Sequence, residues 1–217
     1  MSEWKLPPPR FLACDVGSSI YERAGKVWHT IEEYRGIVRE ALGLQAAAEL
    51  LPLLSDLPGL LPQEHERQGE FKASFYVDVR YPKDQVLQGV EKVLREKKIR
   101  GSLVFSIDPL KGQGLLDVLP RGVNKGSALS FLAERLDLPP ERVLFAGDSG
   151  NDREALRMPY LGVLVGNAPH LLRQVLGEEV RGLGLEKTLH FAEARYSDGV
   201  LEALDHFTWL EAEEEDR

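Results

Sequence analysis

The sequence has little of several features that mark specialised classes of protein. Only one of its 217 residues, Cys14, is a cysteine, so neither an intrachain disulfide nor a cysteine-based zinc site can form. No segment holds about 18 uncharged apolar residues in a row, and the opening MSEWKLPPPR lacks the apolar stretch of a signal peptide. We therefore expect a cytoplasmic protein with no membrane partner.

Basic residues are also scarce relative to acidic ones. The formal net charge is −8, from 27 Lys and Arg against 35 Asp and Glu. Binding to nucleic acid needs concentrated positive charge, so we expect no nucleic-acid partner. What is present, 43% hydrophobic and 29% charged residues, is the composition of an ordinary globular protein with its own core.

Two patterns of hydrophobic residues along the sequence predict an α/β protein. Between residues 71 and 118 the pattern predicts a β-α-β-β unit of its own. After Pro120, helices and strands alternate, which is typical of a mostly parallel, doubly wound sheet in a three-layer α/β/α arrangement. The predicted helices there cover residues 125–136, 153–158, 170–176 and 199–207, and the strands cover 143–146, 162–165 and 188–192. We expect a core of residues 1–60 and 119–217 with an inserted α+β domain of residues 61–118.

Oxygen-bearing side chains gather in one loop after the apolar run that ends at Gly147. Asp148, Asn151 and Asp152 all lie in the hexapeptide GDSGND. Such hard ligands, at the end of a strand where open α/β sheets place their sites, suit Mg²⁺ and a phosphate held with it. The alternative is a simple helix N-cap, for which Asp, Ser and Asn are all good residues. Capping alone does not explain why two acids and an amide crowd one loop, so we favour the metal site.

Lys125 begins a predicted helix in RGVNKGSAL. Taken alone it is a surface lysine, although a cation gains nothing from the dipole at a helix start. Together with Asp148, which follows 23 positions later, it indicates a ligand for phosphate or for a reacting carboxylate.

These motifs together resemble those of the haloacid-dehalogenase (HAD)-like phosphatases. Within that superfamily the chain looks most like the sucrose-phosphate phosphatases, because FLACDVGSSIY, KASFYV, LLDVLPRGVNKGSAL, GDSGND, LGVLVGNAP and ARYSDGVLEALDHF all fit in order and spacing. The resemblance covers nearly the whole chain, and it makes the inserted domain the cap of that family. It implies a Mg²⁺-dependent hydrolase of sugar phosphates, in which an aspartate attacks phosphorus and water cleaves the resulting aspartyl-phosphate.

The resemblance also implies roles for individual residues. Lys125 would hold the phosphate and the nucleophile, Asp148 would ligate the metal, and Asp152 would ligate the metal or orient its waters. The residues that would bind the substrate are Gly17 and Ser18 in a turn, Lys72 and Asp117 in the cap, and Asn151 beside the metal.

One motif of the family is missing. Its first motif, an apolar strand that ends in Asp-x-Asp, supplies the nucleophile and a general acid, and these 217 residues contain no such sequence. FLACDVGSS is a possible degenerate form with Asp15 as nucleophile. However, no strand that ends in Ser or Thr follows within residues 19–69 to serve as the second motif, so the match to the later turn is the better account. We expect the central strand to be absent and the chain, as given, to lack phosphatase activity because the nucleophile segment is truncated or lost.

Two other functions are open at this point. A non-catalytic sugar-phosphate-binding module, like the phosphatase-like domains of some sucrose-phosphate synthases, is the main alternative, although it has less need of a complete metal loop. A response-regulator-like domain would not explain the inserted β-α-β-β unit.

Overall fold

A computed structural model describes residues 7–44, 46–108 and 111–208. The chain divides into two compact units, Met1–Ala128 and Leu129–Arg217. Sheets of both kinds occur, antiparallel in the first unit and parallel in the second, which confirms the predicted α/β class. Among the described residues, no helix combines the length and hydrophobicity needed to cross a bilayer.

The first unit opens with a small antiparallel sheet. Its strands β1 (Phe11–Cys14), β2 (Ser19–Ala24) and β3 (Val27–Thr30) pair in chain order. Helix α1 (Glu32–Leu42) follows and buries Tyr34, Val38 and Leu42, which share one face because they are four residues apart. The helix ends where Gly43 takes up the left-handed conformation of a C-cap.

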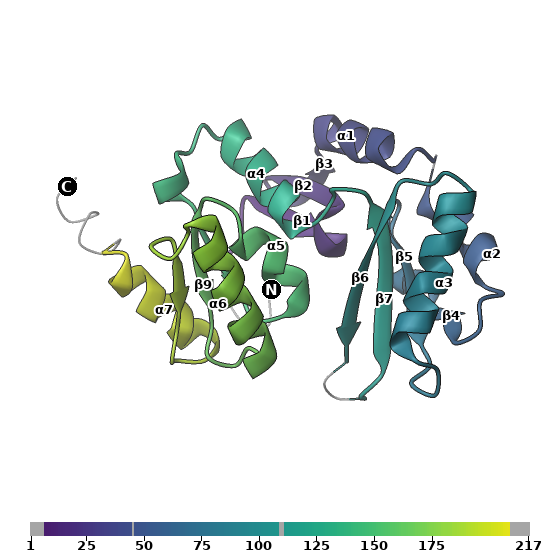
Figure 1. Ribbon diagram of the computed structural model, residues 1–217. Helices are drawn as coiled ribbons and strands as arrows, with labels where there is room; N and C mark the ends of the chain where they lie inside the picture. Colours follow the sequence, from purple (N-terminus) through teal and green to yellow (C-terminus); the bar gives the residue numbers. More distant parts are fainter. Residues whose placement is uncertain (1–6, 45, 109–110, 209–217) are drawn as a thin grey trace. The chain divides into compact units, whose positions relative to one another are not determined.

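A second antiparallel sheet fills the rest of the first unit, and α3 (Lys83–Glu96) covers one face of it (Figure 1). Its order is β4-β5-β7-β6, with bounds Leu60–Pro62, Ala73–Val77, Gly114–Pro120 and Gly101–Ile107. The buried face carries apolar residues such as Phe75 and Leu116, which are cross-strand partners. β5, α3, β6 and β7 confirm the β-α-β-β unit expected from the sequence. The short α2 (Leu51–Leu54) precedes this sheet, and α4 (Lys125–Arg135) follows it and contains the boundary between the units.

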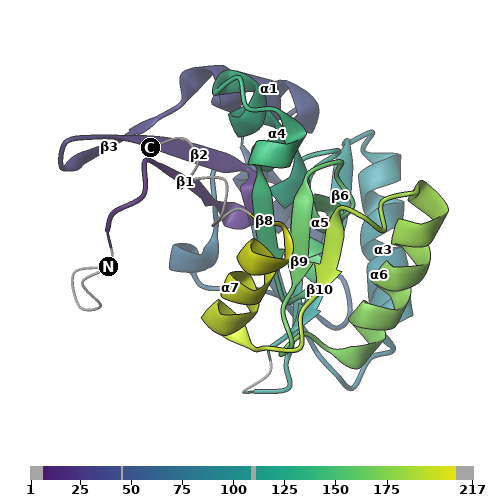
Figure 2. The same cartoon turned by 90° about the vertical axis from the view of Figure 1, so that its left-hand side faces the viewer.

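The second unit is built on a parallel sheet with the order β10-β9-β8. Its strands are β8 (Leu144–Gly147), β9 (Leu161–Leu164) and β10 (Leu189–Phe191), and its further helices are α5 (Arg153–Leu156), α6 (His170–Leu183) and α7 (Tyr196–His206). Figure 2 shows the three strands side by side, with α6 and α7 on opposite sides.

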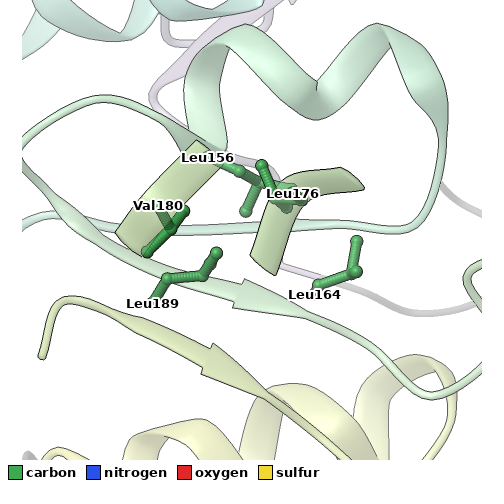
Figure 3. Close-up of a cluster of buried hydrophobic side chains, with 5 residues drawn as sticks. All are labelled: Leu156, Leu164, Leu176, Val180 and Leu189. Carbon is green, nitrogen blue, oxygen red and sulfur yellow. The ribbon is translucent and has the colours of Figure 1, made fainter. Parts of the chain in front are cut away.

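Alternating residues of β9 explain why helices cover both faces. Leu164 belongs to one buried cluster, drawn in Figure 3, with Leu156, Leu176, Val180 and Leu189. Val163 and Val165 point to the other face, in a cluster with Ala192 and Ala203. Strand β9 is therefore buried on both faces, and β8 pairs with it. This pairing positions the carboxyl end of β8, where the GDSGND loop begins.

Helix α6 is longer than the sequence pattern predicts. The expected end at Leu176 is wrong, because the helix continues to Leu183. Gly177 does not stop it, since Val180 on the next turn is buried in the same cluster as Leu176. Gly184, with φ of 70°, is the residue that ends the helix.

Candidate functional site

The GDSGND loop is organised around the carboxylate of Asp152. Its side chain is 4% exposed, and its Oδ2 accepts hydrogen bonds from the backbone N–H groups of Asp148 and Ser149, both at 3.0 Å. Gly147 allows this fold, because a Cβ at that position would lie 2.5 Å from the Cβ of Asp152. Ser149 Oγ also lies 3.0 Å from Asp152 Oδ2 and 2.7 Å from Asn151 Oδ1. Asp152 therefore holds the shape of the loop.

Asp148 is the acid of this loop that faces outward. Its side chain is exposed, and its Oδ2 accepts a hydrogen bond of 2.7 Å from Nδ2 of Asn167, which follows the neighbouring strand β9. Oδ1 of Asn167 in turn accepts a hydrogen bond of 2.8 Å from the backbone N–H of Tyr196, at the start of α7. Asn167 thus orients the Asp148 carboxylate and ties it to a second helix. Asn167 lies in the segment LGVLVGNAP, and its place after the next parallel strand is the sequence signal for its role.

The loop offers Mg²⁺ some of its ligands but not a complete coordination shell. Mg²⁺ usually keeps several waters and takes one or two protein carboxylates together with phosphate oxygens. Asp148 offers such a carboxylate, whereas Asp152 Oδ2 already accepts several hydrogen bonds. Within the part of the chain that the structure describes, no three His, Cys, Asp or Glu side chains gather as a metal site. The loop therefore suits an ion completed by water and phosphate, and it does not form an all-protein cage.

The turn after β1 has an unusual backbone. Asp15, Val16 and Gly17 have φ values of 51°, 58° and 97°, so three successive residues lie in the left-handed region. For the β-branched Val16 this is strained, at a cost of about 1–3 kcal/mol. Ser18 follows fully buried, and its hydroxyl donates to the carbonyl of Asp15 at 3.0 Å. The Ser18 hydroxyl is therefore engaged within the turn.

Tertiary contacts hold this turn against the start of α4. A Cβ on Gly17 would lie 2.3 Å from the carbonyl oxygen of Asn124 and 2.8 Å from the nitrogen of Lys125, so only glycine permits the approach. The Tyr34 hydroxyl donates to the Gly17 carbonyl at 2.6 Å. Burial raises the pKa of Tyr34 above its ordinary value of 10.0, so its hydroxyl stays a donor to a higher pH than an exposed tyrosine would. Two predicted site residues, Gly17 and Lys125, are thereby brought together.

Reciprocal hydrogen bonds place Lys125 at the first turn of α4. The Ser127 N–H donates to Asn124 Oδ1 at 3.0 Å, and the Asn124 N–H donates to Ser127 Oγ at 3.0 Å. This exchange resembles a capping box and satisfies donors that a helix start otherwise leaves open. The sequence N-K-G-S therefore fixes where the lysine stands.

The two site residues predicted in the inserted domain, Asp117 and Lys72, each have a partner. Asp117 on β7 is the cross-strand neighbour of Ser74 on β5, whose hydroxyl donates to Asp117 Oδ1 at 2.6 Å. Lys72 Nζ lies 3.4 Å from Oδ1 of Asp15, with side-chain exposures of 13% and 29%. This ion pair therefore links the turn after β1 to the residue that precedes β5.

The pairing of strand β1 speaks against Asp15 as a nucleophile. Strand β1 pairs antiparallel with β2, whereas a nucleophile at its end requires a central parallel strand.

The predicted site residues divide between the units. Gly17, Ser18, Lys72, Asp117 and Lys125 belong to the first unit, and Asp148, Asn151 and Asp152 belong to the second.

Comparisons with known proteins give one family over almost the whole chain. The family model described as sucrose-6F-phosphate phosphohydrolase matches residues 1–208. A Nitrosococcus oceani protein described as a HAD-like hydrolase is 34% identical over 229 residues, which cover 99% of this chain and 61% of that protein. Mannosylfructose-phosphate phosphatase of Agrobacterium fabrum is 26% identical over 210 residues, with coverages of 95% and 76%. Sucrose-phosphatase 1 of Nicotiana tabacum is 33% identical over 157 residues, and the match spans only 35% of its length.

A solved structure agrees with these sequences. The sucrose-phosphatase of Synechocystis sp. PCC6803, in complex with sucrose and phosphate, matches 95% of this chain and 78% of its own. The TM-score is 0.77 and the sequence identity is 25%. The expected HAD-like fold is thus confirmed.

Proposed function

The chain belongs to the sucrose-6F-phosphate phosphohydrolase family, and from this we propose that it forms most of a Mg²⁺-dependent phosphatase that acts on a sugar phosphate. The observation that carries the proposal is the outward carboxylate of Asp148, held at the end of parallel strand β8 by Asn167. A carboxylate oriented there, with a lysine fixed at a helix start elsewhere in the chain, suits the binding of a phosphate with its metal.

The proposed roles follow the environment of each residue. Asp148 would ligate Mg²⁺, which when bound would offset the negative charge of the phosphate. Asp152 would act through the loop, because its carboxylate is buried and bonded to the loop backbone. Lys125 would hold the phosphate, and Asn151 would contribute polar contacts near the metal.

The sugar would contact the cap residues Lys72 and Asp117. Two relatives support a disaccharide that contains fructose, because one acts on mannosylfructose phosphate and the solved sucrose-phosphatase holds sucrose and phosphate. We therefore propose sucrose 6F-phosphate or a close analogue as substrate. A cytoplasmic location remains part of this proposal and rests on the single cysteine.

We further propose that the nucleophile comes from a strand outside these 217 residues. In the described part of the chain β8 pairs only with β9, so its other edge is open. An open edge next to the metal loop has the hydrogen-bonding groups to accept another strand. An apolar strand that ends in Asp-x-Asp would pair there and supply the aspartate that the sequence lacks.

A binding-only module is the second candidate. The missing Asp-x-Asp motif favours it, because binding of a sugar phosphate needs no nucleophile. It predicts tight binding without turnover even when a strand with that motif is supplied.

Calorimetric titration with sucrose 6F-phosphate tests the proposed metal and phosphate site. We expect binding by the 217-residue chain to be stronger with Mg²⁺ than without it. Asp148→Asn should remove the gain from Mg²⁺, and Lys125→Ala should weaken binding in both conditions. Asp205→Asn, a change at an exposed aspartate of α7, is the matched control and should bind as the parent does. An affinity for sucrose 6F-phosphate that changes neither with Mg²⁺ nor with Asp148→Asn would contradict the proposal.

A further inference from the structure

A cavity lies in the first unit, and none of the predicted site residues lines it. It has a volume of about 560 Å³ and is lined by residues 59–61, 76–81 and 111–113; we call it the distal hollow. It opens at the end of β5 that is opposite to Lys72, since that lysine precedes the first residue of the strand and the hollow begins near its last residues. Strand β5 alone separates the two ends by roughly 13 Å. Asp117 lies nearer, because its cross-strand partner Ser74 is two residues from Tyr76, roughly 7 Å along the strand. Neither Lys72 nor Asp117 lines the hollow.

The aromatic ring of Tyr81 is held in one place at this hollow. Tyr81 is 43% exposed, yet a Cβ on Gly59 would lie 2.7 Å from its Cγ, so the tyrosine side chain packs directly on the glycine backbone. Gly59 also has φ of 80°, which favours glycine. The N–H of Tyr81 donates to the carbonyl of Asp78 at 3.0 Å, which fixes the loop from its other side. An exposed ring that is already immobilised loses little conformational entropy when a ligand stacks on it.

Polar groups with matched charges surround this ring. Arg80 donates to both carboxylate oxygens of Asp78, with contacts of 2.6–3.0 Å. That pairing lowers the pKa of Asp78 and raises the pKa of Arg80, and the two opposite charges offset each other near pH 7. The Tyr76 hydroxyl donates to Glu64 at 2.7 Å. The lining thus offers planar donors and acceptors around an aromatic face and an exposed Leu61. Its described residues include two cations, Arg80, which is paired with Asp78, and Lys111.

We propose that the distal hollow binds a neutral saccharide. The C–H face of a pyranose ring would stack on Tyr81, and its hydroxyls would exchange hydrogen bonds with the Asp78 and Arg80 pair. This combination of an apolar platform and fixed polar groups matches a sugar, which has one apolar face and a rim of hydroxyls. A phosphate would find the guanidinium of Arg80 already engaged by Asp78, which leaves Lys111 as the one other cation among the described residues of the lining. The inference does not depend on the proposed phosphatase function.

Residue-resolved NMR of the ¹⁵N-labelled 217-residue chain tests this site with sucrose as the probe. Amide shifts should change in residues 59–61 and 76–81 as sucrose is added. Tyr81→Ala should weaken the apparent affinity at these residues at least about tenfold, whereas Tyr81→Phe should keep it. Gly59→Ala should displace the ring and weaken binding as well. Thermal unfolding of each variant checks that the sheet is intact.

A variant of the candidate site separates this inference from the proposed function. Lys125→Ala should leave the sucrose-induced shifts at the distal hollow unchanged, whatever it does to sugar-phosphate binding. The inference is overturned if sucrose moves no amide in residues 59–61 and 76–81, or if Tyr81→Ala leaves those shifts unchanged. Shifts that depend on protein concentration without sugar would also overturn it, because a second copy of the chain would then cover the hollow.

Discussion

The loop after β8 and the turn after β1 reach a fixed geometry in different ways. In the loop, the buried Asp152 carboxylate accepts hydrogen bonds from two backbone N–H groups. No residue of the loop, which the structure describes in full, has a positive φ. In the turn, three successive left-handed residues are held by contacts with distant parts of the first unit, among them Tyr34 and the start of α4. The loop is stabilised by hydrogen bonds among its own residues. The strained turn is stabilised by contacts with residues that are distant in the sequence, so substitutions should affect the stability of the two segments differently.

The largest effect should come from Gly17→Ala in the turn. The added Cβ would meet the Asn124 carbonyl at 2.3 Å with φ at 97°, so we expect a loss of about 3 kcal/mol or more in the free energy of unfolding. Gly25→Ala is the matched control, because Gly25 also has a positive φ but no neighbour within 4 Å of its Cβ position. It should lose only about 1–2 kcal/mol. Urea unfolding followed by circular dichroism measures both, and equal losses would show that the contact with α4 does not hold the turn.

The next effect separates the two acids of the loop. Asp152→Ala leaves the N–H groups of Asp148 and Ser149 without their acceptor, which should cost about 2–3 kcal/mol. Asp148→Ala should change the free energy of unfolding by less than about 0.5 kcal/mol, because its side chain is exposed. Urea unfolding of the two variants side by side measures this contrast. If Asp148→Ala is as destabilising as Asp152→Ala, the division into an organising acid and an outward acid is wrong.

A smaller loss is expected from Tyr34→Phe. This change removes one buried hydroxyl that donates to the Gly17 carbonyl, so the free energy of unfolding should fall by about 1–2 kcal/mol. Gly17→Ala combined with Tyr34→Phe should cost less than the sum of the single changes, because both act on the same turn. Strict additivity in urea unfolding would count against a shared role.

The smallest effect concerns a third carboxylate, that of Glu202 within α7, which contacts β10 and the residues that follow it. Glu202 accepts the N–H groups of Glu193 and Ala194 and contacts His190, and these bonds lower its pKa to about 2. Because the folded pKa lies below the ordinary value of 4.5, the stabilisation is present above pH 4.5 and is lost as the pH falls toward 2. Glu202→Gln should therefore flatten the acid side of the stability curve between those pH values. Thermal melts across that range would contradict this if the parent and the variant lose stability in parallel.

The sequence predicted the elements whose patterns are strong and local. The alternating helices and strands after Pro120 and the β-α-β-β unit before it were found because each buries a regular set of apolar residues. The β2–β3 hairpin was not predicted, since its strands carry charged residues such as Glu22 and Arg23 and are only partly buried. Likewise, the true end of α6 depended on burial of Val180 against β9, which periodicity up to Gly177 did not reveal.

Among the site residues, too, those that are close together in the sequence could be predicted, and those that depend on distant contacts could not. Asp148, Asn151 and Asp152 were found because they stand in one short loop, whereas Asn167 reaches Asp148 from 19 positions away through strand pairing. The contact of Asp15 with Lys72 joins two sheets of the first unit, and neither sequence segment signals it alone.

Release of phosphate from sucrose 6F-phosphate in the presence of Mg²⁺ tests the proposed function most directly. The 217-residue chain should release none above background, and the same chain fused to an upstream strand that ends in Asp-x-Asp should release phosphate in a Mg²⁺-dependent way. Asp148→Asn in the fused protein should abolish that release. Mg²⁺-dependent turnover by the 217-residue chain alone, lost on Asp15→Asn, would contradict the account and make Asp15 the nucleophile.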